Sequence, residues 1–181
     1  MQTGVTNIQG NPMVINALPR YDRTDNPTRC CPRFKPAGWD NQELHFKDKL
    51  FVRVKTRSVV HMPLNMGSVF RRTFKAIDDA GARSDDDFIV MSHELSAWSA
   101  EHLFSVKQEV AGQQMVRLSG DFITSVYEGP YKEVPRWHKD MLEKSKARGK
   151  GPNDVYFFYT TCPKCAKAYG ENYVVAVAQV S

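Results

Sequence analysis

The alternation of hydrophobic and polar residues along the chain predicts a mixture of strands and helices. One long strand, or a bent pair, is predicted over 44–61, where apolar residues recur with a period of two. An amphipathic helix is predicted over 67–80, because its apolar residues fall on one face and a glycine follows it. Short strands are predicted at 88–91 and 102–110. The polar residues 92–101 between them predict a loop or one helical turn.

The same order of elements is predicted a second time. A strand over 115–127 runs into a Gly-Pro turn, and a helix follows from about Val134 to Gly149. The apolar, aromatic run 155–159 is strongly strand-prone. A last strand is predicted over 173–180. The chain is therefore a strand–helix–strand–strand unit written twice.

Two such units predict an α+β fold, with module one over 44–110 and module two over 115–181. Each helix covers one face of its own antiparallel sheet, and the two sheets curve around a central cleft, which is a common place for a ligand. The segment 1–43 is predicted to be an N-terminal arm and a covering loop. Its first part, to about Arg29, is polar and proline-rich and is expected to be extended or partly disordered, whereas 30–41 is expected to be an ordered loop.

Composition and charge exclude some classes of protein. The 181 residues are 41% hydrophobic, and no apolar run approaches the ~20 residues that cross a bilayer. The N-terminus has no signal-peptide pattern, so a cytoplasmic protein with no membrane partner is expected. The net charge is +5, and the basic run 144–150 lies at a helix end, where cations complement the helix dipole. No aromatic or glycine motif interleaves with that run, so no nucleic-acid partner is expected.

The turn before the second helix carries a recognisable motif. It reads Tyr127-Glu128-Gly129-Pro130-Tyr131 and matches the pattern His/Tyr-x-Gly-x-Tyr at Tyr127, Gly129 and Tyr131. Together with the duplication, this motif resembles the GyrI-like family, which includes the effector-binding domains of multidrug-sensing regulators and some hydrolases. The resemblance implies a domain that binds bulky, flat or cationic small molecules. The chain is too short to add a helix-turn-helix domain, so it resembles a free-standing member.

Two carboxylates are the candidate catalytic residues. Glu128 lies in the motif itself, and a carboxylate in an apolar cleft can activate water or pair with a cation. Asp154 stands where many related regulators have a buried glutamate just before a tyrosine, here Tyr156. In both cases the plainer alternative is an acid in a surface turn. The pairs His93-Glu94 and Glu101-His102 offer acid–base or metal chemistry, but neither has a recognised ligand spacing.

Aromatic residues are the candidate ligand contacts, because aromatic faces attract planar or cationic molecules. Tyr156 and Phe158 point to one face of their strand, and Phe157 and Tyr159 point to the other. One of these faces packs on the helix and the other lines the cleft. The residues expected to contact a ligand are Tyr127, Tyr131, Tyr156, Tyr159, Trp98 and His61.

The four cysteines occur as two close pairs, Cys30-Cys31 and Cys162-Pro163-Lys164-Cys165. The second pair has the spacing of one side of a tetrahedral zinc site, and Cys30 and Cys31 can complete the site if the N-terminal loop folds back. Two alternatives stay open: free or disulfide-forming cysteines, and a redox pair of the thioredoxin kind. The second is disfavoured because this Cys-x-x-Cys is expected in a hairpin loop.

The sequence thus predicts a protein that binds a bulky aromatic or cationic small molecule between two modules, with hydrolysis as one option. The alternatives are a non-catalytic sensor or sequestering module and a zinc-stabilised interaction protein. A structural zinc is the one cofactor expected, and no organic cofactor is. The protein is expected to be a monomer or a homodimer.

Overall fold

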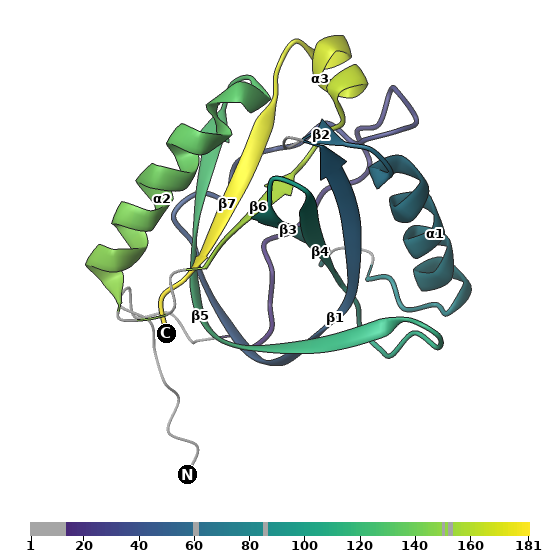
Figure 1. The fold of residues 1–181 in the computed structure, drawn as a ribbon, viewed down its shortest axis with the longest axis horizontal. Helices are drawn as coiled ribbons and strands as arrows, with labels where there is room; N and C mark the ends of the chain where they lie inside the picture. Colours follow the sequence, from purple (N-terminus) through teal and green to yellow (C-terminus); the bar gives the residue numbers. More distant parts are fainter. Residues whose placement is uncertain (1–13, 60–61, 85–86, 150, 152–153) are drawn as a thin grey trace.

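The fold consists of two copies of a strand–helix–strand–strand unit (Figure 1). The computed structural model describes residues 14–59, 62–84, 87–149, 151 and 154–181. The first copy is β1 (Glu43–Val59), α1 (Met66–Asp79), β3 (Val90–Ser96) and β4 (Ser99–Ser105). The second copy is β5 (Gln114–Glu128), α2 (Val134–Arg148), β6 (Val155–Tyr159) and β7 (Tyr173–Gln179). Three short elements complete the described chain: β2 (Met62–Pro63), the 3-10 turn η1 (Tyr131–Glu133) and α3 (Pro163–Tyr169).

The strands of both copies form one antiparallel sheet that closes on itself. Its order is β2-β1-β4-β3-β6-β7-β5, and β1 pairs with β5 as well. The two helices α1 and α2 lie on opposite sides of this closed sheet (Figure 1). This arrangement confirms the predicted α+β fold of duplicated modules around a barrel-like cleft.

The long strand β1 is the element that joins the two copies. Its first half pairs with β5 from Glu43 to Arg53, and its second half pairs with β4 from Phe51 to Arg57. A register shift between Phe46 and Lys49 bends the strand. Such irregularities increase local twist, which lets one strand serve two sheet halves.

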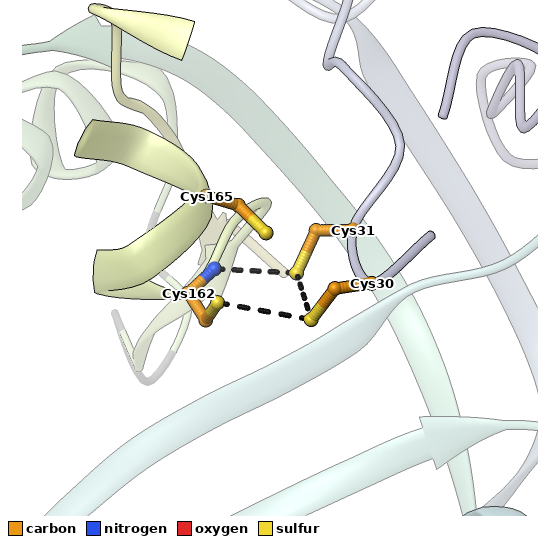
Figure 2. A group of neighbouring side chains, drawn as sticks. All are labelled: Cys30, Cys31, Cys162 and Cys165. Carbon is orange, nitrogen blue, oxygen red and sulfur yellow. Dashed lines mark hydrogen bonds between the residues drawn. The ribbon is translucent and has the colours of Figure 1, made fainter. Parts of the chain in front are cut away.

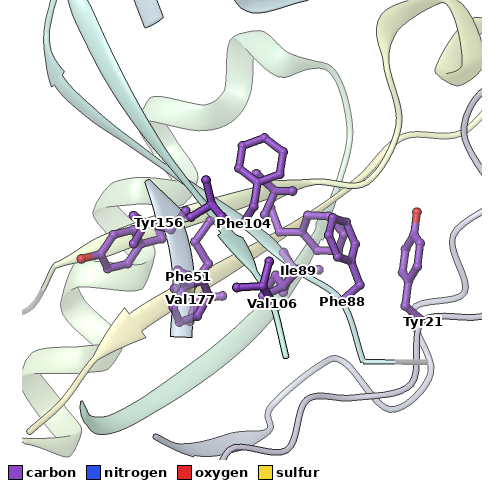
Figure 3. Close-up of a cluster of buried hydrophobic side chains, with 14 of the residues drawn as sticks. Tyr21, Phe51, Phe88, Ile89, Phe104, Val106, Tyr156 and Val177 are labelled. Atoms are coloured by element: carbon purple, nitrogen blue, oxygen red, sulfur yellow. The ribbon is translucent and has the colours of Figure 1, made fainter. Parts of the chain in front are cut away.

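The buried side chains divide according to the face of the sheet. Phe157 of β6 packs beneath α2 in a cluster with Trp137 and Met141. Tyr156 and Phe158, which point to the opposite face of the same strand, belong to the larger cluster inside the closed sheet. Figure 3 shows Tyr156 at one side of this larger cluster and Tyr21 at the other. The predicted alternation along 155–159 is therefore confirmed.

The N-terminal segment fills one end of the space inside the sheet. The rings of Tyr21, Phe34 and Trp39 each lie within 6.4 Å of the Phe158 ring, centroid to centroid. All three are buried. The Thr124 hydroxyl of β5 donates a hydrogen bond to the Trp39 carbonyl, which fixes the end of the segment to the barrel.

Some local predictions are wrong. Residues 92–101 form the β3–β4 hairpin instead of a loop or helical turn, because their polar side chains belong to paired strands with one open face. The last strand of the first copy also begins and ends earlier than predicted, at Ser99 and Ser105. The Cys-x-x-Cys does not lie in a simple hairpin loop: Cys162 is the N-cap of α3 and Cys165 lies within that helix.

Each copy has a turn from its first strand into its helix, which we call the first corner (at Gly67) and the second corner (at Gly129). The two corners differ at these glycines. Gly67 is the second residue of α1, and a Cβ added there would have no atom within 4 Å. Gly129 precedes η1 with a φ of 144°, a conformation that favours glycine, and Trp137 covers it. No helix in the described part of the chain has the length and apolar character needed to span a membrane.

Candidate functional site

An ion pair lies on the cleft-facing side of the β1–β4 sheet. Glu101 of β4 accepts a hydrogen bond of 2.7 Å from Nε of Arg53, and Nη2 of Arg53 lies 2.6 Å from the same oxygen, Oε2. Arg53 pairs directly with Leu103, so antiparallel pairing sends Arg53, Leu103 and Glu101 to one face. Glu101 is only 9% exposed, and a buried carboxylate needs such a partner.

A histidine and a tyrosine from neighbouring strands complete this group. His93 of β3 is directly opposite Glu101 in the register, and its Nδ1 lies 3.8 Å from Oε1 of Glu101. That is an ion-pair distance, longer than a hydrogen bond. The ring of Tyr156 meets the His93 ring edge-on, with centroids 5.3 Å apart. We call Arg53, His93, Glu101 and Tyr156 the cleft group.

Asp154 belongs to the surroundings of the cleft group. Burial, together with the negative charges of Asp154 and Glu101, raises the pKa of Tyr156 to about 12, and the charge of Arg53 opposes this rise. Asp154 is half-buried immediately before β6. The structure thus brings two predicted site residues, Asp154 and Tyr156, together with Glu101.

The cleft group has the parts of an acid–base site. His93 can take a proton, Glu101 can orient the imidazole and stabilise its charge, and Arg53 can stabilise a negative charge that develops on a substrate. The His93 and Arg53 side chains are 29% and 30% exposed, so solvent reaches them.

The neighbouring His102 plays a different part. It points to the opposite face of β4, where its Nε2 lies 2.8 Å from the Thr56 hydroxyl and its Nδ1 lies 2.8 Å from the Ser92 hydroxyl. The Phe70 ring of α1 covers it, with centroids 4.9 Å apart. Burial lowers the pKa of His102 to about 4. His102 is therefore a core histidine with both nitrogens satisfied.

The second corner separates its motif residues. Tyr127 stacks on Trp137 with ring centroids 5.4 Å apart, and its hydroxyl donates a hydrogen bond to Asp140. Glu128 points to the other side and lines a shallow depression of about 290 Å³. The other residues lining this depression are Gly129, Pro130, Ala166, Gly170, Glu171 and Asn172.

The remaining predicted ligand contacts are dispersed. Tyr131 donates its hydroxyl hydrogen to the Thr161 carbonyl, and its ring lies 5.8 Å from that of Tyr159 beside the cluster under α2. Trp98 is exposed at the tip of the β3–β4 hairpin. His61 lies outside the described residues. As ligand contacts these residues stay predictions.

The four cysteines come together at a second candidate site (Figure 2). Their sulfur atoms all lie within 4.8 Å of one another. Cys30 Sγ is 3.8 Å from Cys31 Sγ and 3.9 Å from Cys162 Sγ. The backbone N–H of Cys162 donates to Cys31 Sγ at 3.4 Å. The expected proximity of the two cysteine pairs is thus confirmed.

The donors fit a metal that prefers thiolates. Zn–S bonds of about 2.3 Å in a tetrahedron place the sulfur atoms about 3.8 Å apart, close to the separations of Cys30 Sγ from Cys31 Sγ and Cys162 Sγ. Burial alone would raise the pKa of Cys165, but hydrogen bonds from Thr28, the Cys31 backbone and the neighbouring thiols lower it to about 7. A lowered thiol pKa favours the thiolate that binds metals.

The sequence alone does not single out the cleft group. Arg53 and Glu101 are 48 residues apart, and only the register of β1 against β4 places them together. The usable signals are the pairs His93-Glu94 and Glu101-His102 in the polar run 92–101, and the tyrosine Tyr156, but none of them points to Arg53.

Comparisons with known proteins identify a family. A family model described as bacterial hydrolase matches residues 21–180, which include the N-terminal segment from Tyr21 as well as both modules. Among solved structures, the chain is similar to SAV2435 bound to tetraphenylphosphonium. That similarity has a TM-score of 0.48 and 8% sequence identity, and it covers 78% of this chain and 94% of the other. No curated protein matches the sequence.

Proposed function

The chain belongs to the bacterial hydrolase family, and we propose that it hydrolyses a small molecule at the cleft group. The observation that carries this proposal is the contact of a buried carboxylate, Glu101, with both a histidine and an arginine that solvent can reach. Acid–base hydrolysis requires a base, a group that orients the base, and a positive group for the developing charge. His93, Glu101 and Arg53 supply these three parts.

The proposed reaction runs through water. His93 takes a proton from a water molecule while the water oxygen attacks the electrophilic carbon of the substrate. Glu101 holds the imidazole and stabilises its positive charge, as the carboxylate of other acid–base pairs does. Arg53 stabilises the negative charge on the substrate oxygen. The proton then passes from His93 to the leaving group as the bond to that group breaks.

The ligand that we propose is bulky and aromatic or cationic, as the resemblance to the GyrI-like family implies. The ring of Tyr156 and the negative charges of Asp154 and Glu101 around it support a planar cation. Asp154 would then act on the ligand through its charge.

The sequence candidate Glu128 gives a second location for the same chemistry. It lines the shallow depression at the second corner, where Glu171 supplies another acid. The cleft group is favoured because its carboxylate is buried and paired, whereas Glu128 is exposed. A module that binds without turnover remains the alternative to hydrolysis.

The test uses activated aryl esters. Because these esters react without specific contacts in a binding site, their rate of hydrolysis measures the activity of the catalytic base. p-Nitrophenyl acetate and p-nitrophenyl butyrate are incubated with the wild type, His93→Gln and the control His45→Gln. His45 is bound to Asp121 at 2.7 Å, away from the cleft group. We expect a loss of at least roughly 10²-fold in kcat/KM for His93→Gln and none for His45→Gln. Wild-type turnover no faster than buffer overturns hydrolysis, and equal turnover in all three proteins overturns the role of His93.

A structural Zn²⁺ at the four cysteines is our second proposal. The separations of the sulfur atoms support it, because all four lie within 4.8 Å of one another and two separations, 3.8 and 3.9 Å, match tetrahedral Zn–thiolate geometry. Elemental analysis of the protein purified under reducing conditions tests it. We expect about one zinc per chain, since structural sites stay filled. Less than about 0.2 zinc per chain overturns it.

A further inference from the structure

The segment of residues 21–39, which we call the covering segment, is anchored in the barrel only at its ends. Tyr21 begins it and Phe34 and Trp39 end it, and all three are buried against the interior of the sheet. Between Tyr21 and Phe34 no residue is buried. Apolar burial therefore cannot hold the middle of this segment in place.

The middle of the covering segment makes its contacts with α3 instead. The Thr28 hydroxyl lies 2.9 Å from the Tyr169 hydroxyl and 3.3 Å from Cys165 Sγ. Arg33 stacks over the Tyr169 ring at 4.6 Å and lies 3.6 Å from Glu171. The Tyr169 hydroxyl also donates a hydrogen bond to the Cys31 carbonyl. These polar contacts are few, and the ion pair is on the surface, where such pairs contribute little.

The four cysteines lie at the centre of this contact. Cys30 and Cys31 come from the exposed turn of the covering segment, and Cys162 and Cys165 come from the start of α3. Figure 2 shows the two pairs facing each other across the gap between these two parts of the chain. A metal held by all four sulfurs would link segments that are 131 residues apart.

We propose that metal binding at the four cysteines fastens the covering segment to α3 and so keeps Tyr21, Phe34 and Trp39 inside the barrel. This inference rests on the proposed zinc site and names its role. Ligands that belong to two distant parts of a chain bind a metal only when those parts are together, so the metal favours the docked segment. Loss of the metal removes this link and leaves the middle of the segment with only the few contacts of Thr28, Cys31 and Arg33 with Cys165, Tyr169 and Glu171.

The consequence concerns the surface beneath the segment. Phe34 lies 6.0 Å from the Tyr173 ring and 6.4 Å from the Phe158 ring, centroid to centroid. When the segment opens, these aromatic rings face solvent. The metal therefore decides whether that end of the barrel is closed.

Hydrogen exchange measured by mass spectrometry tests the proposal on the full chain. The protein is compared with its zinc bound and after removal of zinc by EDTA and a mercurial thiol reagent that is then reversed with dithiothreitol. We expect amide exchange in peptides covering 22–33 to rise by at least about tenfold on metal removal, while peptides of β5 are unchanged. Cys30→Ser/Cys31→Ser should show the same rise without treatment. The matched variant Arg33→Gln, which loses the contacts with Tyr169 and Glu171 and the ion pair with Asp25 but keeps all four cysteines, should show a small rise.

The outcomes separate the two proposals. A protein that contains no zinc, or whose mass shows the loss of two hydrogens for each cysteine pair, overturns the zinc site itself. A protein that contains zinc but exchanges equally fast over 22–33 with and without it overturns the fastening role and leaves the zinc site standing. A rise that extends to β5 also overturns that role, because it reports global unfolding.

Discussion

Arg53 and Glu101 meet across β1 and β4 with two guanidinium nitrogens, Nε and Nη2, on one carboxylate oxygen, Oε2. The other oxygen, Oε1, is left on the side of His93, 3.8 Å from its Nδ1. One carboxylate thus lies between a guanidinium on one side and an imidazole on the other. This arrangement links the stability of the sheet to the chemistry that we propose for the cleft.

The Arg53–Glu101 ion pair predicts a measurable loss of stability when one partner is removed. Arg53→Ala leaves Glu101 buried without a counter-charge, so the free energy of unfolding in urea should fall by roughly 2 kcal/mol. The expected loss is below that of a fully buried pair because Arg53 is 30% exposed. Lys75→Ala, which breaks an exposed pair with Asp79, is the control and should change stability little. Equal effects of the two substitutions would contradict the importance of the Arg53–Glu101 pair.

His102 predicts a pH dependence of stability. Its pKa in the folded protein is lowered to about 4 by burial, against about 6.5 in an unfolded chain. The unfolded chain therefore takes up the proton first as the pH falls. His102 therefore contributes fully to stability above about pH 6.5, and this contribution is lost as the pH falls to about 4. The loss in the free energy of unfolding is up to roughly 3 kcal/mol.

Urea denaturation of the wild type and His102→Gln between pH 7.5 and pH 4 measures this effect. The carboxylates titrate equally in both proteins, so the difference between the two curves isolates the histidine. The wild type should lose more stability than the variant over this range. Parallel curves would show that His102 is not buried in its neutral form.

The two corner glycines predict opposite results for the same substitution. Gly129→Ala places a Cβ 3.3 Å from Trp137 at a φ of 144°, so it should destabilise by about 1–2 kcal/mol. Gly67→Ala adds a methyl group in open space within α1, where alanine is the better helix former, and should stabilise by up to about 1 kcal/mol. Thermal denaturation of both variants checks the sign. A loss of stability in both would mean that the corners are equivalent.

The second module can be predicted from the sequence because its elements have strong local signals. The run 155–159 is apolar and aromatic throughout, and the helix before it has a proline in its first turn and a glycine at its end. The turn at Gly129 marks the boundary between the first strand of this module and that helix. Each of these signals depends on neighbours within a few residues, so no tertiary information is needed.

The cleft group cannot be predicted in the same way. The strands β3 and β4 have one face covered by α1 and another that carries His93 and Glu101, so polar residues also fall on the inner face of the closed sheet. The partner of Glu101 depends on the register of β1, which a sequence does not state. The cysteines are easier, because their spacing alone indicates metal chemistry, although the helix α3 around Cys165 is not predicted by it.

The comparison of Glu101→Gln with Glu128→Gln tests the location of the proposed chemistry most directly. Both variants replace a carboxylate by an amide of the same shape, and both are assayed with p-nitrophenyl acetate after their folding is checked by urea denaturation. We predict that kcat/KM falls at least roughly 10²-fold for Glu101→Gln and less than about twofold for Glu128→Gln. A large loss in Glu128→Gln with wild-type turnover in Glu101→Gln would contradict the cleft group and place the reaction at the second corner.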